Sequence, residues 1–399
     1  MKIAIIGAGP AGLLAGGFLS SNHEVHIFDK NEKCGKKLYI TGKGRCNLTN
    51  NCNKDEFFNN VVNGKKFMYS SINQFSPEDI ISFFENIGLK LKTERGNRVF
   101  PESDKSSDVI KALEKFSKDC KIHLNEKVEK ISKKNEEFLI KTHKKEYLFD
   151  RVIISTGGIS YPLTGSTGDG YKFAEEFGHT ITKPKPALVA IELKDWFIKD
   201  LQGISLKNVK IKAISDNKNY EYFGEMLFTD KGISGPIVLT LSSFINRAND
   251  IKLSLDFKPA LSEDKLLSRI LRDVDQCKNK TMSNFVWLYL PKTLANIFLK
   301  LLNIDNQQKV NSFTVKQREN FIKLLKNFPL TFKNLYPIES AIITSGGVAL
   351  NEINPKTMES KLVKGLYFIG EVLDVDCLTG GFNLTQAFST AYACSHNLT

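Results

Sequence analysis

The residues near the start of the chain whose types and spacing could do chemistry are three glycines and an acid. Gly7, Gly9 and Gly12 follow a short apolar run at Lys2–Ile6. In this arrangement the first glycine permits a tight turn, the second lets a pyrophosphate approach the backbone, and the third lets a helix pack closely on a strand. Asp29 lies 17 residues after Gly12, where an acid hydrogen-bonds a ribose hydroxyl. The stretch therefore predicts a dinucleotide-binding site.

A site of this kind needs a strand, a turn, a helix and a second strand in that order. The sequence predicts strands over residues 2–6 and 24–28 and a helix over 13–19, with Pro10 and Ala11 in the turn. The helix then offers unpaired N–H groups and the positive end of its dipole to the phosphates. A lone glycine motif is a weak signal, but here the strand, the helix and the acid accompany it.

The segment after the second strand, residues 29–50, is basic and rich in glycine and asparagine. Such a segment can wrap a bound dinucleotide, with Lys36 or Lys37 near phosphate. Gly44 and Asn47 allow a tight backbone close to a flat ligand. The alternative is a solvated basic loop.

The other end of the chain carries a second candidate device for a nucleotide. A strand predicted over 365–369 runs into Gly370 and Glu371, and a helix predicted over 384–395 follows a glycine pair that ends at Gly381. The acid can hold a ribitol hydroxyl. The helix N-terminus can face the pyrimidine edge of a flavin, which carries negative charge in the reduced form. The alternative is an ordinary C-terminal strand and helix.

A further apolar strand is predicted over 151–156, and it ends in Gly157 and Gly158. This pattern suits a parallel strand whose C-terminal end meets a ligand. Just before it, residues 138–145 and 146–154 have the pattern of a hairpin meander.

The middle of the chain changes character twice. Pro184 and Pro186 mark a boundary, after which short alternating strands predict an all-β segment, a small barrel. Its strands are expected at 187–193, 209–214, 220–228 and 251–257. From Ser262 the apolar period becomes helical. The first helical face is expected to consist of Leu267, Ile270, Leu271 and Val274.

The helical segment, residues 262–334, is also strongly basic. It holds 13 Lys and Arg against 6 Asp and Glu, a net charge of +7 out of +12 for the whole chain. The sharper interpretation is a surface for an anionic partner such as RNA, and the other is a lysine-rich surface that only keeps the protein soluble. Five basic residues are the candidates for RNA docking: Arg269, Arg272, Lys278, Lys280 and Lys292.

The length and composition of the chain limit the number of domains, the compartment and the kinds of site that can be expected. A chain of 399 residues is too long for one simple core, so two or three domains are expected. The seven cysteines are scattered without a CxxC pair, which favours the reducing cytoplasm over a zinc or disulfide framework. No apolar run reaches the length of a membrane span, and the six dispersed histidines indicate no metal site.

Three further strings carry a family resemblance: KLYITGKGRCNLTN near residue 40, GEMLFTDKGISGP at 224–236, and GLYFIGEVLDVDCLTGGFNLTQAFSTAYA at 365–393. Together they resemble the bacterial NAD(P)/FAD-dependent oxidoreductases known as aminoacetone-oxidase-like flavoproteins, of which one branch is assigned as ribosomal RNA dihydrouridine synthase. The resemblance implies the α/β class, with a glutathione-reductase-like FAD-binding Rossmann fold, an inserted β-barrel and an inserted helical subdomain. The implied parts are 1–187 and 335–399 for FAD, 188–261 for the barrel, and 262–334 for the helices.

The same resemblance implies the cofactor contacts. The fingerprint glycines and Asp29 would hold the ADP half, Lys37 and the Arg45–Asn47 turn would lie along FAD, and Val128 would meet adenine through its backbone. The full expected set is Gly7, Gly9, Pro10, Ala11, Gly12, Asp29, Lys30, Lys37, Gly44, Arg45, Cys46, Asn47, Val128, Thr156, Gly157, Gly158, Gly370, Glu371, Gly381, Phe382 and Asn383. Asp230 and Cys377 depart from the family pattern, in which His and Gly are common.

Three functions remain open at this point. A reductase of uridine in RNA would use FAD, with NAD(P)H docking transiently because no second glycine fingerprint follows a strand, and Cys46 or else Cys377 would donate the proton. An oxidase or reductase of a small molecule, such as an amine, needs only a closed pocket. A flavin-binding scaffold without turnover is the third. The sequence leaves the oligomeric state open.

Overall fold

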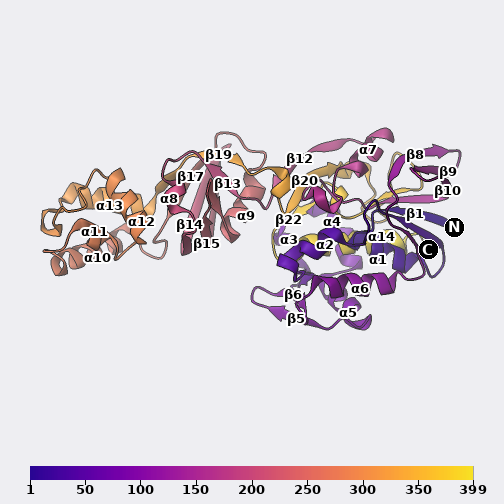
Figure 1. Cartoon of the computed structure of the whole chain (residues 1–399), viewed down its shortest axis with the longest axis horizontal. Helices are drawn as coiled ribbons and strands as arrows, with labels where there is room; N and C mark the ends of the chain where they lie inside the picture. The colour runs from indigo at the N-terminus through magenta and orange to yellow at the C-terminus, as the bar shows by residue number, and fades with distance from the viewer. Residues whose placement is uncertain (399) are drawn as a thin grey trace. The chain divides into compact units, whose positions relative to one another are not determined.

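The computed structural model describes residues 1–398. The chain divides into two compact units, each with its own hydrophobic core (Figure 1). The first unit consists of Met1–Ala187 and the stretch that begins at Pro337, and the second is Leu188–Tyr336. The second unit is thus an insertion within the first. The two divisions fall after residues 187 and 336, and the expected borders at 187/188, 261/262 and 334/335 stay predictions.

The first unit is built around a five-stranded parallel sheet. Its strands in spatial order are β21 (Leu366–Phe368), β11 (Arg151–Ile154), β1 (Lys2–Ile6), β2 (Glu24–Phe28) and β7 (Lys121–His123). Strands from both ends of the chain therefore lie in one sheet. This order confirms the expected Rossmann-like α/β fold.

Helices and small antiparallel sheets complete this unit. The helices are α1 (Pro10–Leu19), α2 (Lys36–Ile40), α3 (Lys54–Asn59), α4 (Lys65–Gln74), α5 (Pro77–Asn86), α6 (Ser106–Phe116), α7 (Asp169–Glu176) and α14 (Phe382–His396). The further strands are β3 (Thr49–Asn50), β4 (Val61–Asn63), β5 (Leu91–Glu94), β6 (Arg98–Pro101), β8 (Val128–Lys134), β9 (Glu137–Thr142), β10 (Glu146–Phe149), β12 (Ile181–Ala187), β20 (Ile343–Val348) and β22 (Asp376–Cys377). Helices α1 and α14, from opposite ends of the chain, pack against each other (Figure 1).

The second unit contains a seven-stranded antiparallel sheet. In spatial order the strands are β18 (Phe328–Leu330), β17 (Lys252–Asp256), β14 (Ser205–Ser215), β15 (Lys218–Phe228), β16 (Gly232–Ser234), β13 (Ile191–Leu193) and β19 (Phe332–Leu335). The two edge strands, β18 and β19, are consecutive stretches of chain separated only by Thr331. The sheet therefore curls back on itself, in the manner of the expected barrel.

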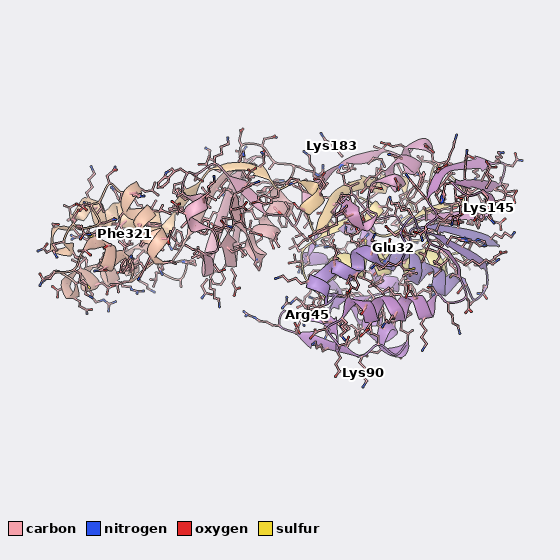
Figure 2. The ribbon with its side chains drawn as sticks, viewed as in Figure 1. Glu32, Arg45, Lys90, Lys145, Lys183 and Phe321 are labelled. Carbon is pink, nitrogen blue, oxygen red and sulfur yellow. The ribbon has the colours of Figure 1, made fainter. Side chains whose placement is uncertain are left out.

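Six helices accompany this sheet in the described residues: α8 (Ile198–Leu201), α9 (Pro236–Ile245), α10 (Glu263–Gln276), α11 (Met282–Val286), α12 (Lys292–Leu301) and α13 (Val315–Lys326). The prediction that 188–257 is all β was wrong at α8 and α9. As expected, Ser262 caps α10, and its hydroxyl accepts a hydrogen bond from the backbone N–H of Lys265. Phe321, labelled in Figure 2, is fully buried among the helices.

Three local predictions need correction. The strand expected over 187–193 is split, because Leu188 has a φ of +53° and β13 starts only at Ile191. The strand expected over 146–154 is also two strands, β10 in the meander and β11 in the parallel sheet. On α10 the buried residues are Leu266 and Ile270, whereas Leu267 and Leu271 are 36% and 45% exposed.

Every helix among residues 1–398 is too short or too polar to cross a bilayer. In the same described part of the chain, no cluster of three or more His, Cys, Asp or Glu could hold a metal ion. All seven cysteines are free thiols.

Candidate active site

The glycine turn between β1 and α1 has the geometry that its three glycines require. Gly7 has a φ of +111°, and a Cβ there would lie 2.6 Å from the carbonyl oxygen of Ser155. A Cβ on Gly12 would lie 2.0 Å from the carbonyl oxygen of Gly7, whereas a Cβ on Gly9 would meet no atom within 4 Å. The first and third glycines are closed in by protein, and the second borders open space. A pyrophosphate needs open space at this position.

The end of β11 lies beside this turn and is bonded to it by Ser155. The hydroxyl of Ser155 donates hydrogen bonds to the carbonyl oxygens of Ile6 (3.0 Å) and Gly7 (2.9 Å). The Oγ1 of Thr156 and the hydroxyl of Tyr171 are buried without a protein hydrogen-bond partner. Burying an unpaired polar group costs free energy. A Cβ on Gly170 in α7 would lie only 2.1 Å from the Oγ1 of Thr156, so this hydroxyl packs against α7.

Asp29 follows β2 and braces the same turn. Its two carboxylate oxygens accept hydrogen bonds from the backbone N–H groups of Ala8 and Asn31, each at 2.8 Å. The acid is thus fixed next to the place where a ribose would follow the pyrophosphate. The neighbouring Lys30 is held elsewhere, because its ammonium lies 2.6 Å from Asp169. Its contact with a cofactor stays a prediction.

Replacing Asp29 with Ala is expected to weaken FAD binding and also to lower the stability of the apo-protein. The change removes a charge-assisted hydrogen bond to ribose, worth roughly 1.5–3 kcal/mol, and leaves the buried N–H of Ala8 without its acceptor. Titration of the apo-protein with FAD measures the first effect and thermal unfolding measures the second. An unchanged affinity for FAD would show that Asp29 does not hold the ribose. Asp29→Asn is the matched control, since it keeps one oxygen acceptor.

The second device lies around Glu371, which joins segments far apart in the sequence. The ammonium of Lys37, on α2, lies 2.9 and 2.7 Å from the two carboxylate oxygens of Glu371 and donates to the hydroxyl of Ser160 at 2.6 Å. The backbone N–H of Thr344, on β20, donates to the same carboxylate at 3.1 Å. The Oγ1 of Thr344 in turn accepts from the N–H groups of Ile159 and Ser160. The structure thus brings Lys37 and Glu371 together, although 334 residues separate them.

Three glycines are closely packed in the part of the site around Glu371: Gly370, Gly157 and Gly158. A Cβ on Gly370 would lie 3.1 Å from that of Ala11 on α1 and 3.9 Å from that of Ala387 on α14. Gly370 therefore lies between the first turn of α1 and the second turn of α14. Gly157 has a φ of +72°, and a Cβ on Gly158 would lie 2.4 Å from the Oγ1 of Thr344.

The N-terminus of α14 is capped by a glycine and pressed against β3. Gly381 has a φ of +97°, and a Cβ there would lie 2.4 Å from the carbonyl oxygen of Thr49. In its hydrogen-bonded orientation, the side-chain oxygen of Asn47 accepts from the N–H of Gly381 at 3.0 Å. Phe382 begins the helix and is buried. The amide of Asn383 bonds the N–H and carbonyl of Cys377 at 3.0 and 2.8 Å, so a contact with a flavin ring stays a prediction.

The loop that precedes Asn47 is strained. Gly42, Lys43, Gly44 and Cys46 all have positive φ, at +57°, +58°, +84° and +59°. A left-handed conformation costs a non-glycine residue roughly 1–2 kcal/mol, and such strain concentrates at functional sites. Figure 2 labels Arg45 beside β5 and β6. Its guanidinium bonds the carboxylates of Glu94 and Asp104 and lies 4.3 Å from the ring centroid of Phe100. Of the three residues Arg45–Asn47, the side chains are held by protein or buried, so the backbone is what this part of the loop presents.

The two thiols expected to act as acids are both enclosed. Cys46 and Cys377 have no exposed surface. Burial raises the pKa of the Cys46 thiol to about 12, and burial, helped by Asp376, raises that of Cys377 well above its ordinary value. The geometry favours packed thiols, and proton transfer from either stays a prediction.

Val128 begins β8, and two residues earlier the N–H of Glu126 donates to the carbonyl of Asp29 at 2.9 Å, which places this segment beside the expected ribose site.

The site as a whole fits a dinucleotide such as FAD. It offers an open glycine and two helices whose N-termini are capped by glycine. Neither α1 nor α14 has an acidic residue in its first turn, so both N-termini can attract negative charge. Sequence reasoning missed Ser155, Ser160 and Thr344. The one available signal was the repetition of Ser-Thr-Gly-Gly at 155–158 as Thr-Ser-Gly-Gly at 344–347.

Comparison with known proteins agrees with this arrangement. The sequence profile described as the HI0933-like protein Rossmann domain matches residues 1–397. A relative named 3-dehydro-bile acid delta(4,6)-reductase, from Clostridium scindens, is 31% identical over 98% of this chain and 97% of its own. Relatives named ribosomal RNA dihydrouridine synthase are 30% identical in Haemophilus influenzae (98% of this chain, 96% of theirs) and 28% identical in Escherichia coli (99% and 97%).

Solved flavoenzymes share the fold. The 3-ketosteroid delta1-dehydrogenase of Sterolibacterium denitrificans, in complex with 1,4-androstadiene-3,17-dione, has a TM-score of 0.52 and 10% identity over 99% of this chain and 98% of its own. FrdA of the Escherichia coli quinol fumarate reductase has a TM-score of 0.50 and 14% identity over 100% of this chain and 70% of its own. The chain belongs to the HI0933-like protein family and is an FAD-dependent oxidoreductase.

Proposed function

We propose that the protein reduces a uridine of ribosomal RNA to dihydrouridine, with NAD(P)H as the electron donor. The observation that carries the proposal is the surplus of basic residues in 262–334, which hold 13 Lys and Arg against 6 Asp and Glu. Arg272, Lys278, Lys280 and Lys292 are exposed. Arg269 is half-buried, 3.6 Å from Asp273 and over the ring of Tyr289. The names of the Haemophilus influenzae and Escherichia coli relatives support the same substrate.

The chemistry adds a hydride at C6 and a proton at C5 of uracil, and the two electrons come from NAD(P)H. Bound FAD supplies the capacity for hydride transfer. The chain's own residues bind and orient: the glycine turn and Asp29 receive the ADP half, and Lys37 holds the carboxylate of Glu371. The N-terminus of α14 favours negative charge on a group placed before it.

A uracil in folded RNA must leave its base stack before it can react. An enzyme that unstacks a base needs a positively charged surface to hold the surrounding backbone. The basic segment 262–334 supports this requirement, whereas a small-molecule enzyme needs no such surface.

A second candidate is the reduction of a small molecule, and one observation favours it. The Clostridium scindens relative, whose name describes the reduction of delta(4,6) bonds in a 3-dehydro bile acid, is 31% identical over nearly the whole chain. A uracil and such a steroid each present a carbon–carbon double bond conjugated to a carbonyl. The same hydride chemistry therefore suits both substrates.

Deletion of the gene, followed by mass spectrometry of ribosomal RNA nucleosides, tests the proposal. One dihydrouridine is expected to disappear, and a plasmid copy of the gene is expected to restore it. The Gly12→Val copy, which lacks room for the fingerprint turn, is the control that should not restore it. Unchanged dihydrouridine in the deletion strain refutes the proposal. Oxidation of NAD(P)H by the purified protein with a 3-oxo-delta(4) steroid would then support the second candidate.

A further inference from the structure

The only two tryptophans of the chain are both exposed, and both lie in the second unit. Trp196 precedes α8 and is 59% exposed, and Trp287 follows α11 and is 38% exposed. The ammonium of Lys300 lies 5.5 Å from the ring centroid of Trp196, and that of Lys292 lies 4.7 Å from the ring centroid of Trp287. Each exposed indole is thus paired with a lysine.

Both lysines project from one helix, α12, which contacts α8 (Figure 1). They are eight residues apart, which corresponds to about 12 Å along the axis at 1.5 Å per residue. Thr293 and Asn296 lie between them and are exposed, while the opposite face of the helix is buried in the core. The outer face of α12 is therefore a polar ridge with a tryptophan–lysine pair near each end.

On the side of this ridge formed by α12 and Trp287 the charge has one sign, whereas at the Trp196 end Lys194 and Lys199 are accompanied by Asp195, whose carboxylate accepts hydrogen bonds from Thr331, and by Asp200. No Asp or Glu occurs between Asp275 and Asp305, whereas that stretch contains Lys278, Lys280, Lys292 and Lys300. Such a positively charged surface repels basic proteins and attracts polyanions. Leu288 and Leu301 are also exposed, but Lys292, Thr293, Asn296 and Lys300 separate the two indoles along the helix, unlike the continuous apolar patch at the core of a typical protein–protein interface.

We infer that the outer face of α12, with Trp196, Trp287, Lys292 and Lys300, is a docking platform for an unpaired stretch of RNA. This inference rests on the proposed function, since the RNA that flanks an unstacked uridine is the ligand. Unpaired bases stack on the two indoles, and the lysines contact phosphates. A duplex is a poor ligand, because its bases are already stacked.

A comparison of the free energies of the two contacts decides whether a base can replace the lysine on the indole ring. A cation–π contact at an exposed site contributes about 0.5–1 kcal/mol. Stacking of a base on an aromatic side chain contributes about 1–3 kcal/mol. A base therefore displaces the ammonium, and the freed ammonium remains close enough to bind the adjoining phosphate.

The tryptophan fluorescence of the holoenzyme tests the platform directly, because only these two residues contribute to it. Titration with a short unstructured oligoribonucleotide is expected to quench the emission, and the same sequence as a duplex is expected to quench it much less. Trp196→Phe and Trp287→Phe each isolate the signal of the other indole. Trp196→Leu and Trp287→Leu should each weaken binding roughly 5-fold to 150-fold, the equivalent of 1–3 kcal/mol per stacked base.

The lysines have a separate readout in the salt dependence of binding. Lys292→Ser and Lys300→Ser should each reduce the slope of log affinity against log salt by about 0.7, the value for one phosphate contact on a single strand. Lys111→Ser on α6, whose side chain is 75% exposed, is the matched control and should leave the slope unchanged. Flavin absorbance and thermal unfolding confirm that every variant is folded. Equal quenching by single strand and duplex, or unchanged affinity in both leucine variants, overturns the inference.

Complementation of the deletion strain separates the platform from the proposed function. If the parent gene restores dihydrouridine and the Trp196→Leu/Trp287→Leu gene does not, both stand. If the two genes restore it equally, the platform is refuted and the proposed function stands. If the deletion strain keeps every dihydrouridine but single-stranded RNA still quenches the purified parent protein and not the double leucine variant, the proposed function is refuted and the platform stands only as an RNA-binding surface.

Discussion

The Gly12→Val protein is expected to purify without the yellow colour of a flavoprotein. Any side chain at this position begins with a Cβ that would lie 2.0 Å from the carbonyl oxygen of Gly7 and 2.7 Å from the hydroxyl of Ser155. Neither neighbour can move freely, because the N–H of Gly7 bonds the carbonyl of Phe28 at 2.8 Å and Ser155 bonds the turn. Overpacking of this kind costs typically 1–3 kcal/mol even where the neighbours are side chains. The helix must therefore separate from the strand, which destroys the phosphate site.

Heat or acid release from the parent protein should yield FAD, and release from the Gly12→Val protein should yield none. Gly9→Ala is the matched control, because its Cβ meets no protein atom within 4 Å and its φ of −80° suits any residue. That variant should keep the stability of the apo-protein and lose affinity only for FAD. A Gly12→Val protein with the parent's flavin content would contradict the role of this glycine. Release of FMN alone from the parent would contradict the assignment of FAD.

The elements around the fingerprint were predictable because local geometry and ligand chemistry impose the same residues. Strands β1 and β2 have the predicted bounds, and α1 begins three residues earlier than predicted, at Pro10. Elsewhere a single backbone conformation decided the outcome. The positive φ of Leu188 ends a strand that the apolar pattern continues to Leu193, and an apolar pattern carries no sign of such a turn.

Helical periodicity has a related limit, which α10 illustrates. The adjacent apolar pairs Leu266–Leu267 and Ile270–Leu271 allow two overlapping apolar stripes. The packing of α10 against α13 selects the stripe that contains Leu266 and Ile270. Periodicity identifies a helix, but a partner element decides which of two possible faces is buried.

The candidate site was predictable in its two halves but not in their connection. Glycines and acids at each chain end indicated nucleotide binding, yet nothing in their spacing joined Lys37 to Glu371 or showed that Thr344 bonds the same carboxylate. The burial of the two thiols shows the same limit of the sequence. Residue type makes Cys46 and Cys377 chemically attractive, whereas their complete burial depends on contacts made across the whole unit.

The connection between the two halves leads to a second strong expectation. Lys37→Met should destabilise the apo-protein, because it leaves the carboxylate of Glu371 with Thr344 as its remaining hydrogen-bond donor among the contacts described. The side chains of Lys37 and Glu371 are each only 21% exposed, so water replaces the lost partner poorly. Hydrogen bonds to charged groups contribute about 1.5–3 kcal/mol. Glu371→Gln should cost a similar amount, since it leaves the ammonium without its counter-charge.

The Lys37→Met/Glu371→Gln double variant then separates a specific pair from two independent contributions. If the pair ties the two chain ends together, the double variant should lose less than the sum of the single losses, with a coupling of about 0.5–3 kcal/mol. Thermal and urea unfolding of the four apo-proteins measure this coupling without FAD. The surface pair of Lys278 and Asp275, whose side chains are 60% and 72% exposed, is the matched control and should show no measurable coupling. Strict additivity at Lys37 and Glu371 would mean that other contacts, such as those of α1 with α14, hold the two chain ends in one site.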